Sequence, residues 1–186
     1  MRADKKEKIL KAAIKVFSGK GYDQATMDEI AMEANVSKGL LFFYYENKEN
    51  LIIESALKSV PIEVMNAIDN TAYLDGNGIL YDLGIKFLYY YKTSDIRNLF
   101  LYTVSNKNKY PALKDKLKDL CFTSFDNIFN RVERMADLKL SLAKKRSFFG
   151  SLLCYLIWWD ENDQSIEEYT TELLKGFYHI NIFLLI

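Results

Sequence analysis

The chain has 186 residues, of which 49% are hydrophobic and 27% charged, and these values exclude a disordered tail. Its 25 basic residues balance its 25 acidic residues, so a net charge of zero excludes a global basic field directed at a polyanion. Only 8 glycines and 2 prolines occur, which favours helices throughout, and the length suits one large domain or a small domain and a medium one.

A first helix is predicted over about residues 4–19. Its apolar stripe has helical spacing and consists of Ile9, Ala12, Ala13, Val16 and Phe17. Gly19 and Gly21 are predicted to end this helix, and Tyr22 is expected to pack on the N-terminal helices. The same helix gathers positive charge at Arg2, Lys5, Lys6, Lys8 and Lys11.

Residues 26–51 carry the most informative pattern, two short helices joined by a tight turn and followed by a third helix. Thr26 is a suitable N-cap, and Glu29 three residues later completes a capping box. Asn35 can adopt the left-handed conformation that ends a helix, and Ser37 can cap the next one. This order of signals predicts a helix-turn-helix, the arrangement that places a helix in the DNA major groove.

An ordinary helical hairpin is the alternative, because short helix pairs are common in helical proteins. The order of capping box, small residue, apolar turn residue and serine cap favours DNA binding. Lys38 and Lys48 flank the predicted reading helix, but acidic Asp28, Glu29 and Glu33 lie between these lysines and the basic residues of the first helix. We therefore expect moderate affinity for DNA and a real dependence on salt.

Further helices are predicted along the rest of the chain. One covers 48–59 and stops at Pro61, a second resumes near Ile62, and others cover about 78–92, 111–136 and 141–160. Ser94 or Asp95 is expected to cap a helix between these, and Ser165 with Glu168 forms a second capping box before the last helix. The sequence predicts an all-α protein with a small N-terminal unit and a larger C-terminal one.

The last two helices carry apolar residues on more than one side. In the first of them one stripe contains Phe148, Leu152 and Tyr155, and another contains Phe149, Leu153 and Ile157. A surface helix needs one apolar face, so the second face is expected to pack on another copy of the chain, unless both helices are central in a larger bundle. The predicted dimer interface comprises Phe148, Leu152, Tyr155, Tyr169, Leu173, Phe177 and Ile180.

Aromatic side chains are frequent in the C-terminal part. At helical spacing such residues are more often core than pocket, but a bundle lined with them also suits an apolar ligand. The candidate ligand-binding residues are Tyr90, Phe100, Phe122, Phe125, Phe129 and Trp158. We expect a small lipophilic or flat aromatic effector, an acyl chain included.

Patterns of catalysis and metal binding are missing from the sequence. The single histidine, His179, lies in an apolar helical segment, which is typical of a core or interface residue. There is no glycine-rich phosphate loop, no His/Cys set at metal-ligand spacing and no nucleophile motif. We therefore expect neither an enzyme nor a protein with a cofactor or metal.

The cysteines and the chain ends indicate a cytoplasmic protein. Cys121 and Cys154 lie far apart in apolar helical surroundings and are expected to be buried small hydrophobes. The charged start lacks a following apolar signal segment, and the last ten residues are too few to span a bilayer. No membrane partner is expected.

Three segments together carry a family pattern: FSGKGY at 17–22, TMDEIAMEANVSKG at 26–39, and NKENL at 47–51 after an aromatic cluster. Over about residues 5–55 they resemble the tetracycline-repressor (TetR) family, and the rest of the chain is similar only in helical layout and length. The resemblance implies a helix-turn-helix DNA-binding domain at 1–50 and a helical-bundle effector-binding and dimerisation domain at 51–186. It further implies a homodimeric repressor that a ligand releases from a double-stranded, palindromic DNA operator.

The resemblance also implies roles for individual residues. Thr26 and Ser37 would contact phosphates, Lys38 would reach guanine, and Leu40 would reach a thymine methyl group. The full set of candidate DNA-binding residues is Thr26, Ser37, Lys38, Gly39, Leu40, Phe42, Tyr44 and Lys48. Gly39 would let the backbone approach the DNA, while Tyr44 and Lys48 would hold the far side of the phosphate backbone.

This sequence departs from the family pattern in the reading helix. Many members have Thr or Ser in place of Leu40, Tyr in place of Phe42 and Phe43, and His in place of Tyr44. Losing those hydroxyls shifts recognition toward apolar contact and DNA shape, and leaves open whether Phe42 and Phe43 belong to the core. Two alternatives remain: an activator or co-repressor-dependent regulator, and a helical dimer that uses its third helix on a protein partner.

Overall fold

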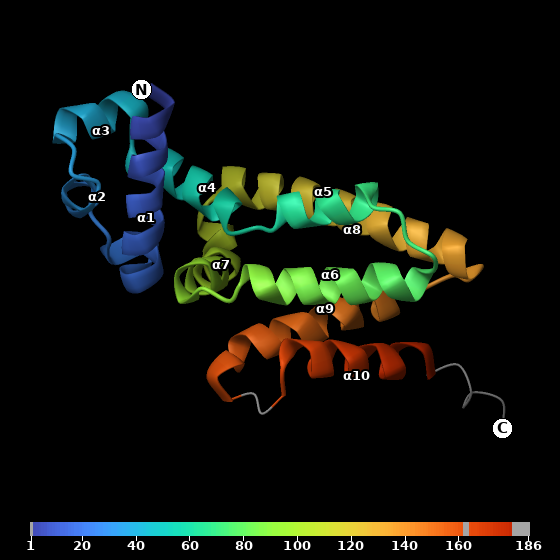
Figure 1. Cartoon of the computed structure of the whole chain (residues 1–186). Helices are drawn as coiled ribbons and strands as arrows, with labels where there is room; N and C mark the ends of the chain where they lie inside the picture. Colours follow the sequence, from blue (N-terminus) through green and yellow to red (C-terminus); the bar gives the residue numbers. More distant parts are fainter. Residues whose placement is uncertain (1, 162–163, 180–186) are drawn as a thin grey trace. The chain divides into compact units, whose positions relative to one another are not determined.

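The computed structural model describes residues 2–161 and 164–179, apart from the side chains at 2, 3, 121, 122, 161, 178 and 179. Every regular element over these residues is helical, which confirms the all-α prediction (Figure 1). The elements are α1 (Arg2–Gln24), α2 (Met27–Glu33), α3 (Lys38–Tyr44), α4 (Lys48–Lys58), α5 (Ile62–Asn70), α6 (Gly76–Tyr90), α7 (Ser94–Asn106), η1 (Lys107–Lys109), α8 (Pro111–Ala136), α9 (Leu142–Ile157), η2 (Trp159–Glu161) and α10 (Ile166–His179).

These helices form two compact units. Unit 1 comprises Met1–Val60 and Lys92–Asp119, and unit 2 comprises Pro61–Tyr91 and Leu120–Ile186. The N-terminal helices therefore share their compact unit with α7 and the start of α8. The predicted boundary at residue 50 divides the chain by function and not by compactness, and it stays a prediction.

Most predicted helix ends agree with the structure because local side chains cap them. Ser165 and Glu168 form the expected capping box, with N–H donors 2.9 and 3.2 Å from the accepting side-chain oxygens. The start of α7 differs from prediction, since its N-cap is Thr93 and no side chain accepts a hydrogen bond there. Within the described part of the chain, no helix is long and apolar enough to cross a bilayer.

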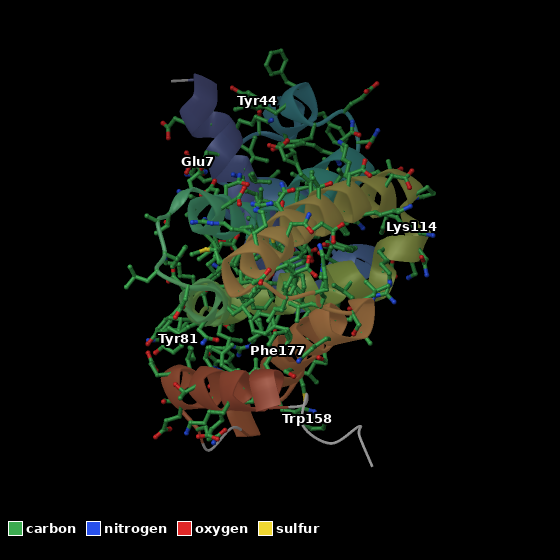
Figure 2. All side chains as sticks on the ribbon, turned by 90° about the vertical axis from the view of Figure 1, so that its right-hand side faces the viewer. Glu7, Tyr44, Tyr81, Lys114, Trp158 and Phe177 are labelled. Atoms are coloured by element: carbon green, nitrogen blue, oxygen red, sulfur yellow. The ribbon has the colours of Figure 1, made fainter. Side chains whose placement is uncertain are left out.

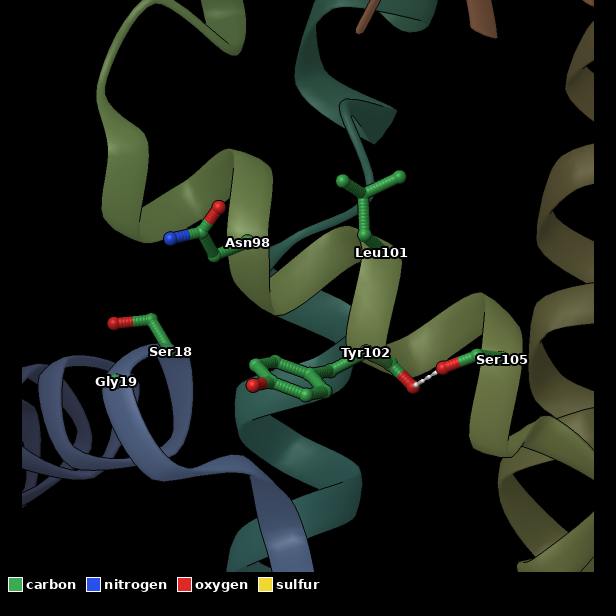
Figure 3. Close-up of a pocket in the computed structure, with 6 residues that line it drawn as sticks. All are labelled: Ser18, Gly19, Asn98, Leu101, Tyr102 and Ser105. Atoms are coloured by element: carbon green, nitrogen blue, oxygen red, sulfur yellow. Dashed lines mark hydrogen bonds between the residues drawn. The ribbon is translucent and has the colours of Figure 1, made fainter. Parts of the chain in front are cut away.

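The first helix runs further than predicted and breaks at a single glycine. Its stripe is confirmed, since Ile9, Ala13 and Phe17 are fully buried in unit 1. Helical structure continues past Gly19 to Gln24, with the break at Gly21, whose φ of 75° suits glycine alone. A Cβ at Gly21 would lie 3.2 Å from the Tyr102 ring, which reaches from α7 toward α1 (Figure 3). The backbone conformation at this break therefore requires glycine, and a side chain there would also crowd the Tyr102 ring.

A buried polar network fixes α1 against α7 in unit 1. The Tyr22 side chain is buried, and its hydroxyl lies 2.5 Å from Thr103 Oγ1. Thr103 donates its own proton to the Leu99 carbonyl at 2.7 Å, so Tyr22 is the donor of the pair. Burial raises the pKa of Tyr22 to about 12, which keeps the hydroxyl protonated as this donor. The expected packing of Tyr22 on the N-terminal helices is confirmed by its edge-to-face contact with Phe17.

In unit 2 the helices α6 and α10 cross at Gly84. A Cβ built on Gly84 would lie 2.7 Å from Thr170 Cγ2, closer than real side-chain atoms approach. Thr170 itself is fully buried. The small size of residue 84 therefore sets how closely these two helices pack.

Replacing Gly84 with alanine is expected to destabilise the protein by about 1–3 kcal/mol, because the added methyl group overpacks the crossing. The matched control is Gly176→Ala in α10, where a Cβ would meet nothing within 4 Å. That change should stabilise the helix by about 0.5–1 kcal/mol through lower unfolded-state entropy. Urea unfolding measures both, and equal effects of the two substitutions would contradict the close crossing.

Candidate nucleic-acid interface

The helix α2 begins with the predicted capping box. Thr26 has extended backbone angles, and its hydroxyl oxygen accepts the Glu29 N–H at 3.2 Å. In return, the Glu29 carboxylate accepts the Thr26 N–H at 3.0 Å. Two backbone donors at the start of α2 are thereby satisfied by local side chains, which fixes where the helix starts.

The turn between α2 and α3 is held by the backbone. Asn35 has a φ of 49°, as predicted, and its N–H donates to the Met32 carbonyl at 3.0 Å. The Val36 N–H donates to the Ala31 carbonyl at 3.0 Å, so the two bonds form a Schellman motif. Ser37 then caps α3 by accepting the Leu40 N–H at 3.2 Å. The helix-turn-helix therefore has a defined angle at its turn.

One side of α3 is packed and the other is open. Leu41 is fully buried, together with Ile30 from α2. Ser37, Lys38 and Gly39 are exposed, and a Cβ at Gly39 would have open space around it. The start of α3 is therefore open to a large ligand such as duplex DNA.

The remaining candidate DNA-binding residues lie in the same unit. Thr26 is exposed and Leu40 half-buried. Tyr44, labelled in Figure 2, is half-buried, and its ring lies 5.3 Å from that of Phe43. Lys48 is half-buried and donates to the Asp23 carbonyl at 3.2 Å.

The two phenylalanines of α3 belong to the surface. Phe42 is 40% exposed and Phe43 is 67% exposed, whereas Tyr45 just beyond them is buried. This excludes both phenylalanines from the core and leaves an apolar edge on the reading helix. Met32, at the end of α2, is also exposed, which the sequence pattern did not indicate.

Every carboxylate of α2 has a lysine partner. Lys20 lies 2.5 Å from Glu29, and Lys15 lies 2.6 Å from Glu33. Lys38 lies 2.6 Å from Asp28, so this pair joins α2 to the reading helix. The acidic residues that dilute the basic patch in the sequence are thus locally neutralised in the structure.

A shallow pocket of about 540 Å³ lies between α1 and α7 in unit 1 (Figure 3). Its lining mixes polar and apolar groups, and Ser18 already donates to the Lys15 carbonyl at 2.9 Å. Ser18 also lies 3.2 Å from an Asp95 oxygen. The pocket contains none of the predicted ligand-binding residues.

An apolar groove of about 360 Å³ lies between α8 and α9 in unit 2. Its apolar wall is formed by Phe125, Phe129, Leu142, Phe149 and Leu153. Phe125 and Phe129 are two of the predicted ligand-binding residues, and the structure brings them together with Phe149, which the sequence placed in a helix stripe. The groove is the feature of unit 2 best suited to a lipophilic molecule.

Basic residues lie at the same groove, but one is already paired. Lys145 Nζ lies 3.2 Å from the Glu133 carboxylate, and Arg146 is exposed. The pKa of Glu133 is lowered, first by the Leu140 N–H that it accepts at 2.7 Å and then by Lys145. The charge of Lys145 is therefore largely offset within unit 2.

The other predicted ligand-binding residues lie elsewhere. Phe100 belongs to α7 in unit 1, and Tyr90 packs edge-to-face on Tyr91 near the end of α6. Trp158 follows α9 and is 55% exposed. The side chain of Phe122 lies outside the described residues. The structure thus places Phe125 and Phe129 of this set at the groove, where Phe125 is half-buried and Phe129 is fully buried in the wall.

Four residues of the predicted dimer interface are core residues of unit 2. Phe148 and Leu152 are fully buried, and Tyr155 and Phe177 are nearly so. The Phe148 ring lies 5.8 Å from that of Phe177, which points from α10 into the unit (Figure 2). Side chains already covered by their own chain offer no area to a partner, so these four leave the predicted interface.

The second stripe of α9 is the open one. Phe149 and Leu153 are half-buried, and Ile157 is 58% exposed. Tyr169 and Leu173 of α10 are half-buried, and Ile180 lies outside the described residues. Cys154 is exposed, contrary to the expected burial, whereas the side chain of Cys121 lies outside the described residues.

Comparison with known proteins places the helix-turn-helix in a family. Residues 9–54 match the profile of "Bacterial regulatory proteins, tetR family". The biofilm operon icaADBC negative transcriptional regulator IcaR of Staphylococcus epidermidis is 27% identical over 157 residues, covering 83% of this chain and 81% of that protein. The profile match and these relatives support a TetR-family transcriptional regulator. These findings point to a DNA-binding regulator of a non-enzymatic family, in agreement with the expectation that the protein is not an enzyme.

Solved structures extend the likeness beyond the helix-turn-helix to the whole fold. PfmR of Thermus thermophilus aligns with a TM-score of 0.72 at 18% identity, over 91% of this chain and 96% of that one. The regulator FadR of Bacillus subtilis, in complex with stearoyl-CoA, aligns with a TM-score of 0.70 at 19% identity. That alignment covers 92% of this chain and 96% of FadR. At these identities the likeness concerns the fold alone.

Sequence reasoning missed one contact in the TetR-type reading head. Asp28 and Lys38 are ten positions apart and belong to different helices, so no helical spacing connects them. The only signal available was that one lysine and one aspartate flank the predicted turn. Their pairing depends on the angle at which α2 and α3 cross.

Proposed function

We propose that the protein is a homodimeric, ligand-responsive transcriptional repressor that binds a palindromic operator through α3. The observation that carries this proposal is the open start of α3, where Ser37, Lys38 and Gly39 are exposed beside a fixed turn. The IcaR relatives are described as negative regulators, which supports repression rather than activation.

In this proposal α3 lies in the major groove. Lys38 donates to guanine O6 or N7, and Leu40 contacts a thymine methyl group. Ser37 donates its hydroxyl proton to a phosphate, while its oxygen keeps accepting the Leu40 N–H. The exposed rings of Phe42 and Phe43 add apolar contact where hydroxyls are missing.

A homodimer presents two such reading heads to two half-sites about one DNA turn apart. The C-terminal end of α9 supports a second copy as partner, because Ile157 and Trp158 there are each more than half exposed and lie outside the groove lining. These two residues replace the buried stripe in the proposed interface, which retains Tyr169 and Leu173 from α10.

The proposed effector is lipophilic, with an acyl chain or flat aromatic body that fits the groove at Phe125 and Phe129. Stearoyl-CoA bound to the structurally similar FadR supports this class. The effector favours a dimer whose reading heads are wrongly spaced, and α4 transmits the change. A coupling free energy of about 3 kcal/mol would lower operator affinity by roughly 150-fold.

The test is selection of random duplex DNA by the purified protein at two salt concentrations, followed by sequencing. An enriched palindrome is the expected result, and a Lys38→Ala/Leu40→Ala variant should not enrich it. Candidate effectors are then screened by release of the fluorescently labelled operator. Absence of binding even at low salt would favour the protein-partner alternative, for which exposed Phe42 and Phe43 would be the contact surface.

A further inference from the structure

The ion pair between Asp28 and Lys38 stands on the open side of the reading head. Asp28 lies in the first turn of α2, and Lys38 is the first residue of α3. Their charged atoms are 2.6 Å apart, and the two side chains are 67% and 60% exposed. The pair is therefore within reach of any DNA that meets the start of α3.

The other two carboxylates of α2 are bound by lysines of a different helix. Glu29 is held by Lys20 and by the Thr26 N–H, and Glu33 is held by Lys15. Both lysines belong to α1. Asp28 differs from these residues because its partner is a residue of the reading helix.

We propose that Asp28 is a specificity-determining residue, which holds the Lys38 ammonium toward the base edges and withholds it from phosphates. This inference rests on the proposed function of α3 as the reading helix. A lysine side chain is flexible and carries a compact charge. Without an ion-pair partner, its ammonium group can bind phosphate oxygens of DNA of any sequence. When Asp28 holds Lys38, the lysine no longer contacts phosphates. It can still donate to the O6 or N7 atom of a guanine at the correct position.

The Asp28 carboxylate contributes a second kind of discrimination. One oxygen binds Lys38, and the group retains acceptor capacity for the N4 amino group of a cytosine. Near a duplex without such a donor, the carboxylate meets only phosphates and acceptor atoms, which it repels. Non-cognate DNA therefore lacks the favourable base contact and is also repelled by the carboxylate.

A purely structural role for Asp28 makes a different prediction. An acidic residue in the first turn of a helix interacts favourably with the helix dipole, and its loss would lower stability alone. In that case neutral asparagine would leave the ratio of operator binding to random-DNA binding unchanged. The two roles are thus separated by a ratio of affinities.

The experiment compares Asp28→Asn with the matched control Glu33→Gln. Each removes one carboxylate of α2 and keeps its volume, but only Asp28→Asn releases a residue of the reading helix. Affinities are measured by fluorescence anisotropy for the selected operator and for a scrambled duplex of equal length, at several salt concentrations. Thermal unfolding of each variant reports whether the fold is retained.

For Asp28→Asn, affinity for scrambled DNA is expected to rise about fivefold, the upper value of an exposed ion pair. The salt dependence should steepen by about 0.9 in logarithmic slope, as for one added phosphate contact. Affinity for the operator should rise by a smaller factor, so the ratio of specific to non-specific affinity falls. Glu33→Gln should shift both affinities by the same small factor, and Asp28→Glu should restore the wild-type ratio.

A double substitution identifies Lys38 as the group released. In a Lys38→Ala background, Asp28→Asn should no longer steepen the salt dependence. Equal behaviour of Asp28→Asn and Glu33→Gln, or the same steepening without Lys38, would overturn the inference. If the wild type selects no sequence, the proposed function fails, yet released Lys38 must still raise binding to scrambled DNA more than Glu33→Gln does.

Discussion

Lys38→Ala is expected to reduce the preference for the operator by about 1–3 kcal/mol at each half-site, the usual value of a specific base contact. Lys38 is the first residue of α3, exposed, and directed by its pairing with Asp28. In a dimer both half-sites lose the contact, so the total loss reaches about 2–6 kcal/mol. Competition between the operator and single-base variants measures it, and the loss should concentrate at particular base pairs.

Lys48→Ala is the control for this result. Lys48 sits at the start of α4 and bonds to the Asp23 carbonyl, which places it beside α1 and away from the start of α3. Its loss should weaken binding to all sequences alike and flatten the salt dependence by about 0.9 in logarithmic slope. Equal effects of the two substitutions on operator and random DNA would refute this division of roles.

The parts of the reading head that the sequence predicted correctly depend on near neighbours in the chain. Thr26 bonds to Glu29, and Ser37 bonds to Leu40, each across three residues. Asn35 adopts the left-handed conformation that its side chain tolerates. Such contacts form in almost any tertiary setting, so their residue types alone identify them.

Four of the seven residues predicted for the interface are buried in their own chain, because two apolar stripes on one helix look alike in sequence. Burial of Phe148 rather than Ile157 depends on where α8 and α10 lie, and this requires long-range packing. The same limit hid the crossing at Gly84, where Thr170 is 86 positions away. Long-range packing also decides that Phe43 is exposed, because a DNA-reading helix and a buried helix can have equally apolar sequences.

The aromatic residues around α8 and α9 pose the same question, whether a ring is core or groove, and substitution answers it. Phe148→Ala is expected to cost about 3–5 kcal/mol of stability, because a fully buried ring leaves a cavity. That is a large share of a native stability of about 5–15 kcal/mol. Urea unfolding measures the loss, and operator binding should survive at low temperature where the variant remains folded.

Phe125→Ala is the matched change on the groove wall, where the ring is half-buried against Phe149. The expected cost is about 1–2 kcal/mol, since part of the ring already meets solvent. Operator affinity should be unchanged, but the concentration of the lipophilic effector needed for release should rise about tenfold, as loss of about 1.4 kcal/mol of ligand contact requires. If Phe125→Ala unfolds as readily as Phe148→Ala, Phe125 belongs to the core, and if it releases DNA at the wild-type effector concentration, its ring does not contact the effector. The groove between α8 and α9 would then lose its place as the effector site, while the DNA-reading role of α3 would stand unaffected.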